Sequence, residues 1–339
     1  MSTAGRLFPL GLGPHCGTCP IIGECGAEET EHACPTDWGE PGWGGEEVLH
    51  PARLDALDHI RALRGFHLKA FRAKPVKVPE LPGYIPQCRW KQDLVGRLKG
   101  PIYGLRPKAI LRKGGIKSAE EVRNHFGLQP TQQLVLILFD HDPYLERLFD
   151  MRAMRELAAA GYDLVISASY SVWSPRPRMH QLYNLVRSLA LCVALQEHDV
   201  PAVPRVDWTI DRDILKWSAW LDENRSVKLV AIDAQTSKHG PSWRQLVAGL
   251  NLLDHQTGGR LHYLINGPTI EPRWAEIYAA TSPERVTFTD ATLHHGTPPS
   301  AQERLDFTRP DGVVDRGLVF LQRERERQVE IERLQQRAA

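Results

Sequence analysis

Residues 133–167 read QLVLILFDHDPYLERLFDMRAMRELAAAGYDLVIS, and the order of apolar and amphipathic segments in this stretch indicates the fold class. An apolar run at 134–139 precedes an amphipathic segment at 151–160 that ends at Gly161, and a second apolar run follows at 163–166. Continuous apolar strands that alternate with helices are typical of a parallel sheet covered on both faces. The stretch therefore predicts an α/β fold.

The same alternation extends on both sides of this unit. Eight apolar runs are separated by helical patterns, and they cover residues 109–111, 134–139, 163–166, 202–206, 228–232, 261–265, 286–288 and 318–321. Because eight strand–helix units close a (β/α)8 barrel, we predict a TIM-like barrel over residues 109–339. A doubly wound open sheet is the alternative, although no G-x-G-x-x-G follows a predicted strand and the sequence holds no P-loop.

Two segments of opposite charge precede the predicted barrel. Residues 1–50 carry eight acidic side chains against Arg6 alone, whereas residues 64–117 contain fourteen Lys or Arg and two acids. We predict a small module at 1–50 and, over 51–108, a helix followed by a basic, Pro-rich connecting arm. Such a positive stretch attracts a polyanion in a salt-dependent way, so we expect DNA or RNA as a partner. A solvated face that neutralises the acidic module is the alternative. The candidate phosphate contacts are Lys91, Arg97, Lys99, Arg106, Lys108, Arg112 and Lys113.

Four cysteines stand close together in the acidic module, at Cys16, Cys19, Cys25 and Cys34. Four thiolates in a segment without a core of its own need an ion to hold them, so we predict a metal site. The C-x2-C-x5-C spacing is similar to loops that wrap a [4Fe–4S] cluster in SPASM domains and WhiB-type regulators. We favour the cluster, with zinc as the alternative.

No membrane or export signal is apparent. No apolar run approaches the ~18–20 residues that span a bilayer, and the N-terminus has no apolar segment long enough for a signal peptide. We therefore expect a cytoplasmic protein that does not insert into a membrane.

Carboxylates follow four of the predicted strands, and in a barrel the chemistry takes place at these carboxyl ends. Asp140, Asp207, Asp233 and Asp290 would converge on one mouth, and we take them as candidate catalytic residues. Each of them is also suited to capping the following helix, as Asp211 and Asp213 are expected to do. The candidate substrate-binding residues near the mouth are Tyr170, Trp173, Trp208, Gln235, Asn184, Arg187 and Asn266. For Arg187, a buried structural ion pair is the alternative.

Three stretches carry a resemblance to a known family. They are DHDPYLERLFD at 140–150, YDLVISASYSVW at 162–173 and YNLVRSLALCVALQEHDVPAVPRVDW at 183–208. The chain over about residues 133–270 resembles a domain-of-unknown-function family of phage and mobile-element proteins. That resemblance implies a mobile-element setting but no particular activity.

A second resemblance concerns the late strands. RLHYLINGPTIEPRWAEI at 260–277 and VTFTDATLHHG at 286–296 look like the late strands of tRNA-guanine transglycosylases and their DNA-acting phage relatives. The resemblance implies that Asp290 is the nucleophile and Asp140 the earlier carboxylate. The chain departs from those enzymes because it has no Asp-Ser-Gly-Gly-Phe-Gln, no Gly-Gly-Leu-x-Val-Gly-Glu and no C-terminal zinc site.

Our leading hypothesis is therefore an enzyme that exchanges or removes a nucleobase in DNA or RNA. Carboxylates at the mouth would act at C1′ and move protons, while aromatic side chains would hold an extruded base. Two alternatives stay open. One is a non-catalytic nucleic-acid-binding protein that works through its metal module and basic arm, and the other is a barrel enzyme that acts on a small metabolite.

Overall fold

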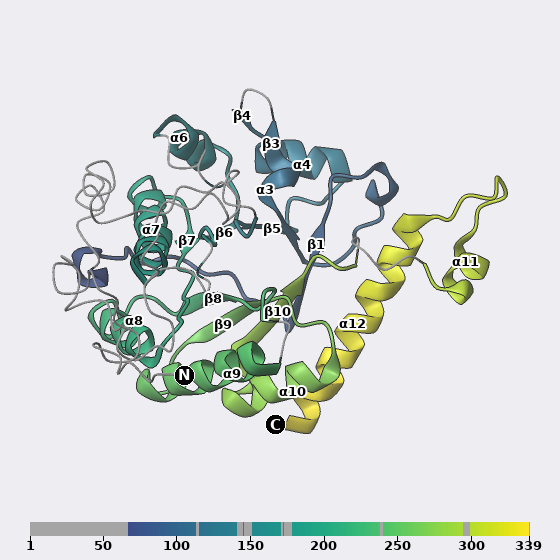
Figure 1. Ribbon diagram of the computed structural model, residues 1–339. Helices are drawn as coiled ribbons and strands as arrows, with labels where there is room; N and C mark the ends of the chain where they lie inside the picture. Colours follow the sequence, from purple (N-terminus) through teal and green to yellow (C-terminus); the bar gives the residue numbers. More distant parts are fainter. Residues whose placement is uncertain are drawn as a thin grey trace, which may run out of the picture.

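The computed structural model describes residues 67–112, 115–140, 145, 151–170, 172, 178–237, 240–293 and 299–338. At its centre lies a sheet of eight parallel strands with the neighbour order β7-β6-β5-β2-β1-β10-β9-β8 (Figure 1). The strands are β1 (Tyr84–Cys88), β2 (Ile102–Leu105), β5 (Gln133–Ile137), β6 (Leu164–Ile166), β7 (Ala202–Val203), β8 (Leu229–Asp233), β9 (His262–Asn266) and β10 (Val286–Asp290). Because successive strands are neighbours and β10 pairs with β1, the sheet curls into a barrel.

The two end strands of this order, β7 and β8, also meet. The amide of Ala231 donates to the carbonyl of Pro204 at 2.9 Å, and the amide of Val206 donates to the carbonyl of Ala231 at 2.8 Å. These bonds form a short parallel bridge between Arg205 and Ala231. The result is a nearly closed, all-parallel, TIM-like barrel, which confirms the predicted fold class.

Alternating side chains fill the barrel and its surroundings in two separate clusters. Ile85, Ile137 and Leu264 belong to the inner cluster, in which the strands face one another. Their neighbours Tyr84 and Leu136 belong to the larger outer cluster, which the strands share with the helices. This alternation follows from the two-residue period of a β-strand, and it decides which strand-end side chains face the mouth.

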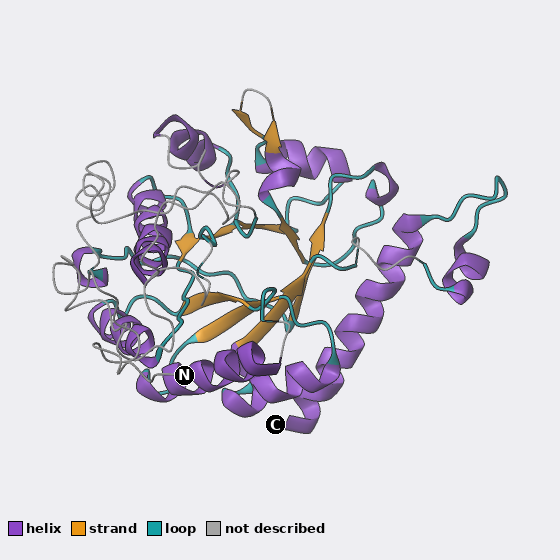
Figure 2. Cartoon of the chain, in the orientation of Figure 1, coloured by secondary structure: helices purple, strands orange, loops and turns teal. Residues whose placement is uncertain are grey.

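Helices cover the outside of the strands (Figure 2). They are α3 (Pro107–Ile110), α4 (Ala119–Phe126), α6 (Met151–Ala159), α7 (Arg178–Glu197), α8 (Asp211–Glu223), α9 (Gly240–Gln256), α10 (Glu271–Ala280) and α12 (Arg316–Ala338). The short helix α11 (Ala301–Phe307) lies outside this layer, against α12 (Figure 1). A capping box begins α4: the Ser118 hydroxyl accepts from the amide of Glu121, and the Glu121 carboxylate accepts from the amide of Ser118. The short 3-10 helix η4 (Gln92–Leu94) lies between β1 and β2, and α12 packs against β1, η4 and α10.

Two of the eight predicted strands are wrong. Residues 109–111 lie at the end of α3 and the start of a two-stranded hairpin, β3 (Leu111–Arg112) with β4 (Gly115–Ile116), and residues 318–321 lie inside α12. In their place, the segment predicted as a connecting arm supplies β1 and β2. Pro86 lowers the strand signal of β1 because it cannot donate a ladder bond. It is tolerated where the pairing of β1 passes from β10 to β2.

Part of the sequence-based prediction falls outside the described residues. The module at 1–50, with its four cysteines, and the helix expected from residue 51 cannot be compared with the structure. Among the residues that are described, none of the helices combines the length and the apolar composition needed to pass through a bilayer.

Candidate active site at the barrel mouth

Five inward-facing polar side chains are joined across the mouth of the barrel. Gln87, near the end of β1, donates through Nε2 to Asn266 Oδ1 at 2.8 Å and to Thr289 Oγ1 at 3.1 Å. Asn266, at the end of β9, then donates through Nδ2 to Asp233 Oδ1 at 2.9 Å. Arg106, just after β2, donates from Nε to Gln87 Oε1 at 2.8 Å. The network therefore connects β2, β1, β10, β9 and β8 at their carboxyl ends.

Asp233 ends β8 and is the carboxylate that this network orients. Besides the bond from Asn266, its Oδ1 accepts from the amide of Gln235 at 3.1 Å, and its Oδ2 accepts from the Ser169 hydroxyl at 3.1 Å. Gly267 allows the loop after β9 to approach the backbone of Gln235, since its φ is +119° and a Cβ would lie 2.7 Å from the nitrogen of Gln235. Asp233, Gln235 and Asn266 thus come together as the sequence predicted.

Asp207, in the loop after β7, is the second carboxylate of the mouth. It forms an ion pair with Arg205 and accepts from the amide of Trp208 at 2.9 Å. Burial raises the pKa of Asp207 to about 6, the Arg205 guanidinium opposes this shift, and the charge of Asp233 adds to it. Its side chain is still 24% exposed, so protons have access to it. A carboxyl with this pKa is suited to general acid–base work near neutral pH.

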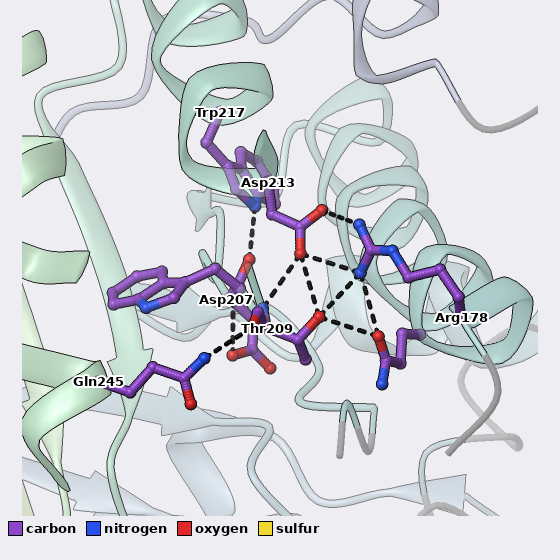
Figure 3. Close-up of polar contacts among 8 residues, drawn as sticks. Arg178, Asp207, Thr209, Asp213, Trp217 and Gln245 are labelled. Atoms are coloured by element: carbon purple, nitrogen blue, oxygen red, sulfur yellow. Dashed lines mark hydrogen bonds and ion pairs between the residues drawn. The ribbon is translucent and has the colours of Figure 1, made fainter. Parts of the chain in front are cut away.

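The loop that carries Asp207 is braced by a buried polar cluster (Figure 3). Arg178, at the start of α7, pairs with Asp213 of α8, and Asp213 Oδ2 accepts from the amide of Thr209 at 3.0 Å. Gln245 of α9 donates to the carbonyl of Thr209 at 2.6 Å. Asp213 is therefore not the helix cap that the sequence predicted, because the residue at the cap position is Ile210.

Two arginine nitrogens at the mouth are buried without a hydrogen-bond acceptor among the described residues: Nε of Arg205 and Nη2 of Arg106. The other nitrogens of Arg205 pair with Asp207 and donate to the carbonyl of Tyr170 at 3.0 Å. Burial lowers the pKa of Arg106, and the carboxylates of Asp233 and Asp140 act against that shift. The mouth thus combines buried positive charge with several carboxylates.

A pocket of about 380 Å³ opens beside this network, where β1, β2 and β5 end. Four cationic side chains line it, together with Trp90 and Asp140; the cations are Arg89, Lys91, Arg106 and Lys108. Asp140 therefore lies on the pocket side of the mouth. Three of the seven basic residues predicted to hold phosphates, at positions 91, 106 and 108, meet here.

The other predicted basic contacts lie elsewhere. Arg97 forms a bidentate ion pair with Asp315, with distances of 2.8 and 3.0 Å. Lys99 is exposed and precedes β2, which puts it toward the opposite, amino-terminal end of that strand. Neither the side chain of Arg112 nor any part of Lys113 is among the described residues. The basic stretch is thus divided between the mouth and other surfaces of the barrel.

Asp290, predicted to be the nucleophile, does not join the mouth network. It shares the outward face of β10 with Phe288, whereas Thr289 points inward to Gln87. Its carboxylate accepts from the Tyr84 hydroxyl at 2.9 Å, from Arg327 of α12 at 3.2 Å and from the amide of Thr292 at 2.7 Å. The Asp290 side chain is only 1% exposed, so its carboxylate connects β10 to α12 and is not directed at a ligand.

The aromatic residues predicted to hold a substrate are packed into the protein. Tyr170 is fully buried, and the guanidinium of Arg187 lies 3.9 Å from its ring centre. Trp208 packs against α9, where a Cβ on Gly249 would lie 2.1 Å from its indole nitrogen. Asn184 of α7 is also buried, and Trp173 is outside the described residues. The Tyr170 ring is therefore occupied by Arg187 of α7, although Tyr170 directly follows Ser169, which bonds Asp233.

The predicted metal ligands Cys16, Cys19, Cys25 and Cys34 are likewise outside the described residues. Within the part of the chain that is described, no three His, Cys, Asp or Glu side chains are grouped so as to hold a metal ion. The metal site remains a prediction from the cysteine spacing.

Sequence reasoning missed Gln87 and Arg205, and it placed Arg106 on an arm instead of at a strand end. One signal was available: the run YIPQC at 84–88 is apolar and ends in polar residues, as strands that reach a barrel mouth do. Arg205 was visible as a charge within an apolar run. Neither a protein-family model nor a curated protein matches this chain.

Proposed function

We propose that this chain is an enzyme that removes or exchanges a nucleobase in DNA or RNA, with its chemistry at the barrel mouth. One observation carries the proposal: Asp207, with a pKa near 6, lies within electrostatic reach of Asp233, which three donors orient. Enzymes that cleave a bond at an anomeric carbon combine an acidic carboxyl with a second carboxylate. Cleavage of an N-glycosidic bond requires the same two groups, because the base leaves as the sugar carbon becomes positive.

The two carboxylates then take different roles. Asp207 is the general acid, which protonates the departing base. Asp233 is the nucleophile or the charge stabiliser at C1′, and the bonds from Asn266 and Ser169 fix its direction. Asp290 is not assigned a chemical role, because its outward contacts to Tyr84 and Arg327 already occupy it.

The test is mass spectrometry of small molecules released when the purified protein meets phage DNA, host DNA and total RNA. We expect a free base to appear with the wild type and to disappear with Asp233→Asn and with Asp207→Asn, while binding is retained. Asp222→Asn is the matched control, because this exposed carboxylate on α8 should leave release unchanged. Binding without any release from the wild type would contradict the proposal and favour a non-catalytic binding protein.

A second candidate is a barrel enzyme that acts on a small phosphorylated metabolite. It is favoured by the finding that the basic segment contributes β1 and β2 to the barrel, and by a pocket of about 380 Å³, a size that suits a small molecule. The same assay, run with free nucleotides and sugar phosphates, separates the two. Turnover of these compounds without release from nucleic acid would support the second candidate.

A further inference from the structure

Positive side chains predominate among the described residues that line the pocket at the ends of β1, β2 and β5. Of these residues, four are cationic and one, Asp140, carries a carboxylate, while the charges of Asp233 and Asp290 also act on Arg106. Burial lowers the pKa of Arg89, and the charge of Arg106 lowers it further, so these two guanidinium groups repel each other. Binding of an anion in such a pocket is favourable, because its negative charge compensates the cationic side chains.

Arg106 shows where such an anion would bind. Its Nε is used on Gln87 at 2.8 Å, whereas its Nη2 is buried and lacks an acceptor among the described residues. A buried donor without a partner is costly, because it has lost its water without gaining a hydrogen bond. The rigid fork of a guanidinium matches the oxygens of a phosphate group, so one more acceptor at this point satisfies Arg106.

The same residue connects the pocket to the carboxylate site. Arg106 contacts Gln87, Gln87 contacts Asn266, and Asn266 contacts Asp233. An anion at Arg106 would therefore be connected to Asp233 through the side chains of Gln87 and Asn266, and the charge of Asp233 acts on Arg106. Lys108 and Lys91 are exposed at the rim, where they can reach further oxygens of the same group.

We infer that this pocket binds a phosphate group of the substrate through Arg106, with Arg89, Lys91 and Lys108 around it. Phosphate is the ligand chemistry, and it has two sources: the terminal phosphate of a free nucleotide, or the backbone phosphate of a single-stranded nucleic acid. The choice of a nucleotide unit rests on the proposed function, whereas the phosphate pocket does not.

The experiment measures binding by titration calorimetry with three probes: inorganic phosphate, a nucleoside 5′-monophosphate and a short single-stranded oligonucleotide. The matching nucleoside without phosphate serves as the blank. We compare the wild type with Arg106→Gln, Arg106→Lys and Lys108→Gln. The control is Arg225→Gln, which removes the same charge from an exposed site just before β8, at the opposite end of the barrel.

We expect the wild type to bind the phosphate-bearing probes and not the nucleoside. Loss of a charged hydrogen bond should weaken binding about tenfold or more in Arg106→Gln, with Arg225→Gln unchanged. Tighter binding of the monophosphate identifies a free nucleotide as the source, and tighter binding of the oligonucleotide identifies the backbone. Lys108→Gln, at an exposed position, should weaken binding in the same direction if Arg106→Gln fails to fold.

Two results would overturn the inference. One is a wild type that binds none of the phosphate probes, and the other is an equal loss in Arg225→Gln, which would mean diffuse attraction rather than a pocket. The proposed function fails separately. If phosphate binding depends on Arg106 but no substrate is turned over, the phosphate pocket is supported and the catalytic proposal is contradicted.

Discussion

Replacing Asp213 by Asn should destabilise the protein more than any exposed carboxylate change on the same helix. The side chains of Asp213 and Arg178 are 0% and 3% exposed, so Asn would leave a buried guanidinium without its counter-charge. Breaking a buried ion pair by removing one partner costs about 3–5 kcal/mol. The bonds from Arg178 and from the amide and hydroxyl of Thr209 converge on this carboxylate, which places the expected value within that range.

The assay is denaturant unfolding followed by tryptophan fluorescence, because Trp217 donates to the carbonyl of Asp207 beside the cluster (Figure 3). Trp208, whose amide bonds the Asp207 carboxylate, is a second reporter. Asp211→Asn is the matched control; it changes an exposed carboxylate in the same helical turn and should shift stability by no more than about 0.5 kcal/mol. Replacing both partners by apolar residues, as in Arg178→Met with Asp213→Leu, should cost less than Asp213→Asn alone. A loss below about 1 kcal/mol in Asp213→Asn, or a loss equal to that of Asp211→Asn, would refute this reasoning.

Further changes probe the site and the fold. If Asp207 is the general acid with a pKa of about 6, kcat/KM for base release should fall as pH rises above that value. The residual activity of Asp207→Asn should not show this fall at high pH. An unchanged pH profile in the variant would assign the proton to another group. Burial raises the pKa of Glu324 to about 7, so its stabilising contribution is present below pH ~4.5 and is lost as pH rises through 7. Glu324→Gln should therefore gain about 3 kcal/mol relative to wild type between those limits in unfolding experiments, whereas the exposed Glu332→Gln should show no such gain. Gly249→Ala should cost about 1–3 kcal/mol and lower base release, because the new Cβ would meet the ring of Trp208; Gly240→Ala, which meets only the flexible end of Arg244, is the control. The cysteine module should contain iron with acid-labile sulfide, or else zinc, in elemental and sulfide analysis, and Cys19→Ser should reduce that content; a metal-free native protein would contradict the prediction.

The strands and helices that the sequence predicted correctly are those with strong local signals. The run at 134–139 and the helix that ends before Gly161 are recognisable without tertiary contacts, because their periodicity and end signals lie within a few residues. The first two barrel strands lack such signals. β1 contains Pro86, and β2 is four residues long with Gly104 in its middle. Only pairing with β10 and β5 makes them strands.

The candidate site shows the same division. Asp207, Asp233 and Asn266 were found because a polar residue after an apolar run marks a strand end, and strand ends meet at one mouth in a parallel barrel. Whether such a residue faces the mouth depends on its parity along the strand and on the register with neighbouring strands. No local signal sets the register of β10, so Asp290 was expected at the mouth but faces α12 and Arg327.

Local hydrophobic periodicity was enough to predict the α/β class, the barrel and the strand-end positions of most carboxylates. Three features became visible only in the folded chain: β1 completes the barrel, Arg106 meets Gln87 at the mouth, and cations line the pocket beside them. These features join residues distant in the chain, and closure of the barrel fixes their register and side-chain direction.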